Sequence, residues 1–502
     1  GRIVAFQKGE ITSQGVPDPN NPNYFIMQKG NNNVDWLKEH YKSSAFAHEH
    51  NLSINGGSEA VQYYISANYL DQNGLLRYGE DNYHRYAFTS KINAKITDWA
   101  SVNVSTKFTR GDIDQPNFLK DNSRLFYNGI SRVWPNTPKN YDHGGDTFST
   151  YILPLRDGGR AKSQDDYLYQ QVQLVLEPIK GWRIFGEGNY RMRNLFEHNE
   201  VLPIEELGFD GVTSIQWPVV PYATGLTRVT ERAYRENFFN MNVYTEYGKT
   251  FDSGHTFKVM VGFNSELSKD RDFSGYRDGL ITPSLPTIDT ATGDEKITKG
   301  SYNQWATAGF FGRLNYNYKE RYLFEANLRY DGTSRFLSEK RWNWFPSFSA
   351  GWNLAREEFM ESLSEDISVL KIRGSYGQLG NQNTESLYPF YPLVPIEASN
   401  CNWLLNGAKP NKVSPAPLIS RYLTWETVES WGLGLDFGFL NNRLTGSVDY
   451  FSRITKDMVG PAPELPLTLG TDVPKMNNAD LRTNGWELDL SWRDRLKNGL
   501  TY

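Results

Sequence analysis

Hydrophobic and polar residues alternate along much of this chain with a period of two. In the clearest stretch, the even positions from Tyr86 to Ile96 are mostly apolar, whereas the odd positions from Arg85 to Lys95 are mostly polar. A tight turn separates this stretch from residues 102–108, which alternate in the same way. Because successive side chains of a strand point to opposite faces, the pattern predicts a hairpin with one apolar and one polar face. Strands of a membrane β-barrel have such faces, since they contact lipid on the outside and a polar lumen on the inside.

The same alternation recurs in later parts of the chain. It is found in residues 310–318, 322–330, 431–437, 444–450 and 486–492. Tyr322 and Tyr330 stand at the two ends of one predicted strand. A tilted membrane strand uses about 9–11 residues, and aromatic rings favour the two membrane–water interfaces. We therefore expect Tyr322 and Tyr330 to mark the two interfaces.

Predicted strands are joined alternately by short turns and by long connections. Short turns are predicted near residues 56–58, 97–99, 178–181, 252–254, 319–321 and 440–443. Long connections are predicted near residues 111–164, 194–237, 266–302, 379–423 and 455–481. A barrel with short periplasmic turns and long extracellular loops sorts its connections in this way, whereas a soluble β-sandwich has no reason to do so. The exception is residues 355–368, which predict a short amphipathic helix on the short-turn side.

These patterns predict an all-β fold, an antiparallel transmembrane β-barrel of about fifteen strands in residues 47–502, incomplete at both ends. Residues 1–46 are rich in Asn, Gly and Pro and are expected to form an irregular extracellular connection. About fifteen strands cannot close with antiparallel neighbours throughout, and open edges are costly in hydrocarbon. No export signal is visible at the start, and the last three residues resemble the beginning of another strand. We therefore interpret the chain as an internal piece of a longer protein.

The amino-acid composition limits which class of protein this chain can belong to and which partners it can bind. Of the 502 residues 38% are hydrophobic, and no apolar run approaches the ~20 residues of a membrane helix, so helical spans are not expected. The 14 Trp, 30 Tyr and 28 Phe are consistent with two membrane interfaces. A formal net charge of −5 without a basic cluster in the sequence argues against nucleic acid as a partner. Cys401 is the only cysteine, which rules out an internal disulfide framework and a cysteine metal site.

Seven short segments of the chain carry recognisable motifs. They are residues 33–36 (NVDW), 50–58 (HNLSINGGS), 69–74 (YLDQNG), 322–336 (ending RYDGTSRF), 345–352 (FPSFSAGW), 370–377 (LKIRGSYG) and 475–487 (KMNNADLRTNGWE). These segments resemble the SusC/RagA family of TonB-dependent outer-membrane transporters of the Bacteroidetes type. The match covers most of the chain in the family's order, which makes the resemblance specific.

The resemblance implies a barrel of about 22 strands with a plugged lumen, in the outer membrane of a Gram-negative cell and in contact with its lipid. It implies import of oligosaccharides or peptides, driven by the proton-motive force through the TonB complex and without a bound cofactor. It also implies a SusD-like lipoprotein that closes over the extracellular face. The plug, the TonB box, the first strand and the final strands of the family pattern are not found in the sequence, so no gating residue is assigned.

Two patterns offer metal ligands, and each has a simpler interpretation. His48 and His50 lie on one face of a predicted strand, but no third ligand follows at a supporting spacing, and a loop end accommodates histidines without a metal. Asp165 and Asp166, like the aspartates of residues 142–146, offer oxygen ligands in predicted loops, where turn chemistry explains them equally well. We predict no metal site and keep a loop calcium ion as the alternative.

The sequence contains no motif of an enzyme active site that we recognise. It has no Gly-x-Ser-x-Gly elbow and no His-Glu-x-x-His. Gly248-Lys249-Thr250 is not a phosphate loop, because Val243 stands where that loop requires glycine. We therefore expect no enzymatic activity. The alternatives are an outer-membrane barrel enzyme, which an activity assay would reveal, and an adhesive or structural β protein, which detergent solubility would distinguish.

Aromatic residues in the long connections are the candidate ligand-binding residues. Sugar rings present C–H faces that stack on aromatic side chains, while nearby polar groups supply hydrogen bonds. For each residue the alternatives are loop packing and contact with the lipoprotein lid. The candidates are Trp134, Tyr141, Trp217, Tyr222, Tyr388, Phe390, Tyr391 and Trp403. Because these side chains suit glycans and peptides alike, the sequence does not identify the cargo.

Overall fold

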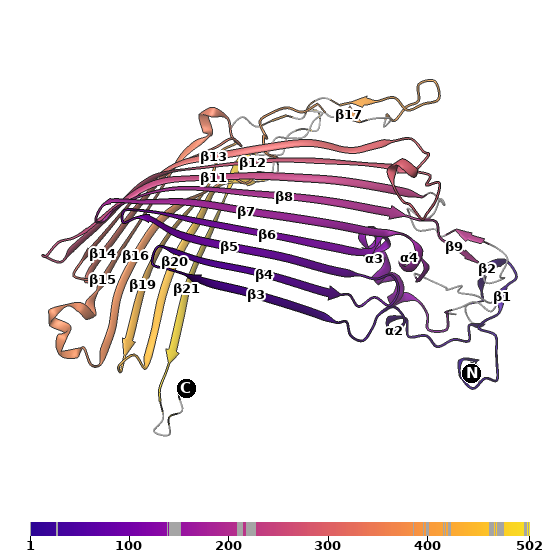
Figure 1. The fold of residues 1–502 in the computed structure, drawn as a ribbon, viewed down its shortest axis with the longest axis horizontal. Coiled ribbons are helices and arrows are strands. Elements are labelled where there is room, and N and C mark those ends of the chain that lie inside the picture. Colours follow the sequence, from indigo (N-terminus) through magenta and orange to yellow (C-terminus); the bar gives the residue numbers. More distant parts are fainter. Residues whose placement is uncertain are drawn as a thin grey trace.

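Fifteen strands form one large antiparallel sheet in the computed structural model (Figure 1). The strands pair in the order in which they occur along the chain, from β3 to β21. They are β3 (Ala47–Gly57), β4 (Val61–Asn73), β5 (Asn82–Thr97), β6 (Ala100–Pro116), β7 (Arg160–Ile179), β8 (Trp182–Val201), β11 (Arg228–Thr250), β12 (His255–Asp278), β13 (Lys296–Tyr318), β14 (Tyr322–Thr333), β15 (Trp342–Asn353), β16 (Ile367–Asn381), β19 (Glu426–Phe439), β20 (Leu444–Gly460) and β21 (Met476–Trp492). The predicted all-β antiparallel fold and its strand number are confirmed.

The structure describes all residues except 1, 27–28, 138, 140–151, 208–213, 217–226, 385, 395, 398–400, 415, 417, 420–422, 461–465, 467, 469–475, 496–498, 500 and 502. Within this part of the chain the sheet is not closed, because β3 and β21 each pair on one side only. The sheet is strongly bent, so that β14 to β21 run at a steep angle to β3 to β13 (Figure 1).

Smaller elements lie outside the large sheet. The helices are α1 (Arg2–Gln7), α2 (Trp36–His40), α3 (Asn117–Arg132) and α4 (Ile152–Asp157), with short 3₁₀ helices η3 (Ile288–Thr290), η4 (Ser338–Lys340), η5 (Leu354–Arg356) and η6 (Glu358–Leu363). Two-stranded ladders pair β1 (Pro17–Asp18) with β2 (Asn21–Phe25), β9 (Glu205–Leu207) with β10 (Ser214–Gln216), and β17 (Ile396–Glu397) with β18 (Lys412–Val413). None of the helices in the described residues is both long enough and apolar enough to cross a bilayer.

The two ends of the sheet differ in their connections, as predicted (Figure 1). At one end the strands are joined by turns of a few residues, such as 251–254 between β11 and β12. In the turn between β13 and β14, Lys319 and Glu320 adopt φ values of 52° and 58°. Two consecutive residues with positive φ match the right-handed twist of paired strands, which keeps the hairpin tight. The long connections, with α2, α3 and α4, lie at the other end (Figure 1).

The strands extend further into the long connections than the sequence pattern predicted. The connection predicted at residues 194–237 begins after Val201 and ends before Arg228, and β11 and β12 reach 23 and 24 residues. Their outer ends carry polar residues on both faces, so they show no alternation although their backbones remain paired. The helices α3 and α4 within residues 111–164 were not predicted. The helix predicted at residues 355–368 is wrong in type, because this segment forms η5 and η6 instead.

The large sheet has an apolar face and a polar face, in agreement with the predicted parity. Phe88, Phe324 and Leu435 are 42%, 40% and 36% exposed, so none of them is buried in a soluble core. On β11 the exposed apolar residues run from Phe239 to Tyr247, which we call the apolar band. The length of this band matches that of a tilted strand that crosses a bilayer, which is about 9–11 residues. Amide and charged residues occupy the alternate positions and form the polar face.

Aromatic rings lie at both ends of the apolar band. Near the short turns, the ring of Tyr322 stacks between those of Tyr318 and Trp352, at centroid distances of 6.3 and 6.4 Å. Toward the long connections, the ring of Tyr330 stacks on Trp344 at 4.4 Å. Membrane–water interfaces favour aromatic side chains, so a membrane barrel is expected to carry two such belts. The spacing of Tyr322 and Tyr330 therefore predicted the two aromatic belts, and their position at membrane interfaces stays a prediction.

Most of the buried apolar side chains lie where the long connections fold back over the strand ends. The main cluster contains Leu76, Phe118, Phe126, Ile130, Leu153, Leu155, Val201 and Ile204. A second cluster contains Phe336, Phe345 and Trp425. A single sheet with an exposed apolar face has no second layer to bury it, so a core forms only where other segments cover the strand ends.

Candidate functional site

A row of hydrogen-bonded amides and carboxylates crosses the polar face. Glu187 of β8 accepts hydrogen bonds from Gln173 of β7 at 3.2 Å and from Asn189 at 2.7 Å. The Asn189 amide also donates to Asn240 of β11 at 3.0 Å. Such cross-strand polar pairs fix the register and leave a wall that water wets. The polar face therefore has the chemistry of an aqueous lumen rather than of a protein core.

Ion pairs reinforce the polar face further along the sheet. Arg373 of β16 donates to Asp436 of β19 at 3.1 Å and to Asp449 of β20 at 2.6 Å, so one guanidinium joins three strands. Arg373 and Asp449, together with Lys258 and Glu325, line a hollow in this face. Charged groups that alternate in sign make such a surface suitable for polar ligands or polar protein segments.

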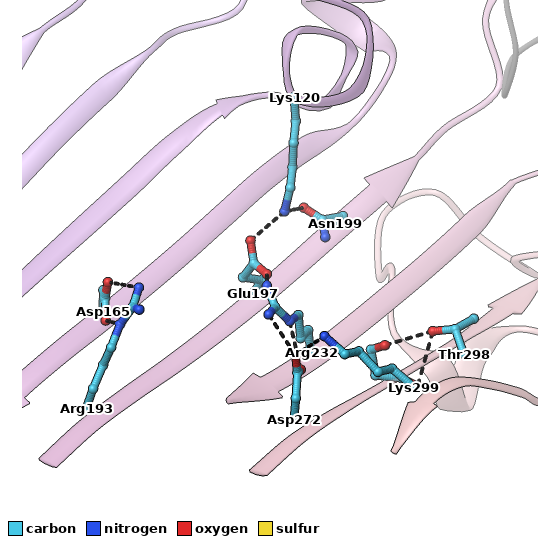
Figure 2. A network of polar contacts seen from close by, with 10 residues as sticks. Lys120, Asp165, Arg193, Glu197, Asn199, Arg232, Asp272, Thr298 and Lys299 are labelled. Atoms are coloured by element: carbon cyan, nitrogen blue, oxygen red, sulfur yellow. Dashed lines mark hydrogen bonds and ion pairs between the residues drawn. The ribbon is translucent and has the colours of Figure 1, made fainter. Parts of the chain in front are cut away.

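A network of charges joins α3 to four strands beyond the apolar band (Figure 2). Lys120 of α3 contacts Glu197 of β8 at 2.7 Å, and Glu197 accepts from Arg232 of β11 at 2.8 Å. Arg232 and Lys299 of β13 both reach Asp272 of β12, at 2.9 and 2.5 Å. Hydrogen bonds from Arg232, with those from Lys299, lower the pKa of Asp272 to about 2. The network holds the outer strand ends together and ties the connection that contains α3 to them.

A second charged group lies on the opposite face of the same strand ends. The His198 ring contacts Glu200 at 3.1 Å through Nε2 and Glu231 at 2.5 Å through Nδ1. These hydrogen bonds, with Glu200 first, raise the pKa of His198 to about 9. The imidazolium therefore persists at neutral pH and pairs with both carboxylates, balancing one of their two charges.

Three of the predicted ligand-binding aromatics come together. Phe390 and Tyr391 have ring centroids 4.7 Å apart, and Tyr388 lies 6.1 Å from Phe390. The Tyr388 hydroxyl donates to the Gln304 carbonyl of β13 at 2.5 Å, which fixes this cluster against the large sheet. The sequence pattern indicated these residues one by one, but their grouping depends on the fold of the connection.

The other predicted aromatics are separate or lie outside the described residues. The Trp134 side chain is 55% exposed, and its carbonyl accepts a hydrogen bond from the Trp36 indole at 3.2 Å. Trp403 is also exposed. Tyr141, Trp217 and Tyr222 lie outside the described residues. Ligand contact by any of these residues stays a prediction.

Sequence reasoning missed an aromatic shelf on the polar face, formed by Phe238 and Trp305 with arginines beside them. The ring centroids of Phe238 and Trp305 are 6.1 Å apart. The Arg191 guanidinium lies 5.0 Å from the Phe238 centroid, and that of Arg335 lies 5.5 Å from the Trp305 centroid. These four residues come from distant parts of the chain. Only the polar-face parity of Phe238 and Trp305, where an apolar residue is unexpected, could have indicated them.

The described residues show no group of three or more His, Cys, Asp or Glu side chains arranged to hold a metal ion. Asp165 and Asp166, predicted to lie in a loop, instead lie in β7 and point to opposite faces. Arg193 binds Asp165 at 2.8 Å and Arg110 binds Asp166 at 2.6 Å, so both carboxylates already have cationic partners. The aspartates of residues 142–146 lie outside the described residues, and calcium binding there stays a prediction.

A long antiparallel meander with an apolar outer band, two aromatic belts and a polar inner wall defines part of an outer-membrane-type β-barrel. The chain belongs to the TonB dependent receptor-like β-barrel family, whose model matches residues 12–502. The resemblance to SusC/RagA-type transporters inferred from the sequence is confirmed by sequence similarity to SusC, and the RagAB transporter shares the fold.

Two named relatives show the extent of the similarity. The TonB-dependent receptor SusC of Bacteroides thetaiotaomicron is 26% identical over 500 residues, which cover 94% of this chain and 47% of SusC. The TonB-dependent receptor P3 of Formosa agariphila is 26% identical over 493 residues, covering 94% of this chain and 46% of that protein. The chain thus spans about half the length of the curated relatives it matches.

Solved structures show the same fold. The RagAB peptide transporter matches with a TM-score of 0.75 at 21% identity, over 93% of this chain and 51% of that chain. The P. aeruginosa receptor FpvA, solved with a bound pyoverdine, matches with a TM-score of 0.51 at 12% identity, over 89% of this chain and 52% of that chain. At these identities the likeness establishes the shared fold and not a shared cargo.

Proposed function

We propose that this chain is the barrel wall of a TonB-dependent importer in the cell outer membrane of a Bacteroidetes-like Gram-negative bacterium. In this proposal residues 47–502 span the membrane, with the short turns in the periplasm. Residues 1–46 and the long connections face the outside. The observation that carries the proposal is the division of one sheet into an apolar face with two aromatic belts and a polar face, in a chain of the TonB-dependent receptor family.

The cargo in this proposal is a large nutrient, an oligosaccharide or a peptide. A SusD-like surface lipoprotein would hold the cargo over the mouth of the barrel. The TonB complex would then transmit the proton-motive force to a plug, and movement of the plug would open a path to the periplasm. The barrel wall contributes enclosure, ligand contact and loops that engage the lid, without bond chemistry or a bound cofactor.

The proposed ligand contacts lie at the long-connection end of the polar face. The cluster of Tyr388, Phe390 and Tyr391 and the aromatic shelf of Phe238 and Trp305 offer ring faces beside arginine side chains. Flat aromatic surfaces next to hydrogen-bond donors suit both sugar rings and peptide side chains. Among the residues that the structure describes, no observation favours the enzyme or the adhesive alternative.

Uptake by cells tests the proposal. The intact protein is isolated from native outer membranes, and the partner and ligand that accompany it are identified by mass spectrometry. Uptake of that ligand is then measured in wild-type cells, in cells lacking the protein and in wild-type cells treated with a protonophore. The proposal predicts uptake in untreated wild-type cells only. Uptake that survives the protonophore, or hydrolysis of the ligand by the purified protein, contradicts it.

A further inference from the structure

Three basic side chains gather on the apolar face, just beyond the apolar band. Arg235 of β11 and Arg271 of β12 are direct cross-strand partners, and Lys269 lies two positions from Arg271 on the same face. The apolar band of β11 begins at Phe239, four positions from Arg235. In the proposed membrane placement the three cations stand near the height where a bilayer changes from hydrocarbon to headgroups, with the exposed rings of Phe196 and Phe273 two positions further out on the same face.

These cations differ from the other arginines on the same strand ends. Arg228 and Arg232 are each bound to an aspartate of β12, at 2.6 and 2.9 Å. Among the ion pairs of the described residues, none includes Arg235, Lys269 or Arg271. On this face of β11 the nearest carboxylate toward the outer end is Glu231, which is bound to His198.

The contacts that the arginines do make leave their charge uncompensated. Arg235 approaches the Met192 sulfur at 3.9 Å, and the Arg271 guanidinium lies 5.3 Å from the centroid of the exposed Tyr302 ring. Like charges directly opposite each other across a strand pair are destabilising. An anion beside the pair would relieve this repulsion, and the position of the pair beside the apolar band would place that anion in the membrane interface.

We infer that Arg235, Lys269 and Arg271 bind the phosphate groups of a lipid headgroup in the outer leaflet. This inference rests on the membrane placement in the proposed function, but not on transport or cargo. Guanidinium groups form paired hydrogen bonds to phosphate oxygens, and an ammonium adds a third donor. Asn237, between Arg235 and the apolar band and opposite Lys269, supplies a neutral donor at the same site.

The lipid is favoured over soluble anions because of the face on which the cations lie. Cargo in the lumen meets the polar face, whereas these side chains share their face with Phe239 and the rest of the apolar band. A lipid packs its acyl chains against the apolar band and places its phosphate groups beside the cations. Inorganic phosphate contacts the cations alone.

Native mass spectrometry of the intact protein in detergent tests the inference. The probes are monophosphoryl lipid A, the same lipid with its phosphate removed, and inorganic phosphate. The triple variant Arg235→Gln, Lys269→Gln, Arg271→Gln removes the cations. A matched control, Lys180→Gln, Lys249→Gln, Lys319→Gln, removes the same charge from the short-turn end of the sheet. Migration of unheated samples in detergent gels verifies that each variant is folded.

We expect wild type and control to bind monophosphoryl lipid A equally and the triple variant to bind it at least about tenfold more weakly. This follows because each basic residue near an anionic surface contributes about fivefold in affinity. The phosphate-free lipid should bind all three proteins as weakly as the variant binds lipid A. Equal binding of both lipids by the wild type, equal loss in the control, or retention by the triple variant overturns the inference. Inorganic phosphate that binds the wild type as tightly as the lipid also overturns it.

Transport measurements separate this inference from the proposed function. If the triple variant loses lipid A binding while uptake fails even in the wild type, the proposed function is wrong and the lipid site stands. If uptake is energy-dependent and the triple variant binds lipid A like the wild type, the lipid site alone is wrong.

Discussion

Arg232 of β11 reaches diagonally across to Asp272 of β12, and both guanidinium-to-carboxylate distances are 2.9 Å. The Asp272 side chain is only 4% exposed, and it also binds Lys299. One carboxylate thus pairs with cations from the strands on either side of it. This contact adds a side-chain link to the backbone pairing of the outer strand ends, which lie beyond the apolar band.

Substitution of Asp272 tests how much that contact contributes to the free energy of unfolding. Asp272→Asn should lower the free energy of unfolding by about 2 kcal/mol at neutral pH, because Lys299 loses its carboxylate partner and Arg232 loses one of its two. Folding lowers the pKa of Asp272 from 3.8 to about 2, so its stabilising contribution is complete above pH 4 and is lost as the pH falls toward 2. Guanidinium unfolding of the intact protein at several pH values measures the difference.

The control for Asp272→Asn is Asp270→Asn, on the same face of β12. Asp270 accepts a hydrogen bond from Asn303 but forms no ion pair among the described residues. This variant should stay within about 0.5 kcal/mol of the wild type. Equal losses for both variants would show that the network around Arg232 has no special role.

His198 should stabilise the strand ends in the opposite pH range. Its pKa rises from 6.5 to about 9 on folding, so the contribution is complete below pH 6.5 and is lost as the pH rises through 9. His198→Gln should cost about 1–2 kcal/mol at pH 6, a value reduced for the exposure of Glu231. Unfolding measured between pH 6 and 10 checks this, with His50→Gln on β3 as control. A penalty that does not shrink above pH 9 contradicts the assignment.

The two faces of β14 should respond differently to a new charge. Leu328 lies on the apolar face and is 45% exposed, whereas Asn327 lies on the polar face and accepts a hydrogen bond from Arg313 at 2.6 Å. Leu328→Arg should cost about 2–4 kcal/mol in folding into lipid vesicles, because the charge meets hydrocarbon. Asn327→Arg should be far milder, since it meets water. Equal damage would disprove the membrane placement of the two faces.

Phe126 should hold the connection between β6 and β7 in place. Its side chain is fully buried, with the rings of His40 and Phe118 at 5.6 and 6.3 Å. Phe126→Ala should destabilise this cluster by about 3–5 kcal/mol. Limited proteolysis should then cut residues 117–157 faster while the strands stay protected. Leu37→Ala, at an exposed residue of α2, should leave the cleavage rate unchanged.

The sequence alone predicted the features that depend on neighbouring residues. The alternation around Phe88, the turn after Tyr318 and the aromatic pair Tyr322 and Tyr330 are local, because strand geometry turns each side chain by a fixed amount. From these features followed the strand number, the two faces and the sorting of connections. Short segments of the sequence were also enough to recognise the family resemblance. The helices α3 and α4 were missed, although Phe118, Phe126 and Ile130 of α3 recur at helical spacing and lie on its buried face.

Only the tertiary structure decided which residues far apart in the chain contact each other. Arg232 and Asp272 are 40 positions apart, and no local pattern indicates that they meet. The same holds for the shelf of Phe238 and Trp305, and for the basic cluster of Arg235, Lys269 and Arg271, which is invisible in a sequence without a run of basic residues. Composition and period determine which side chains share a face, whereas the register between strands determines which of them touch.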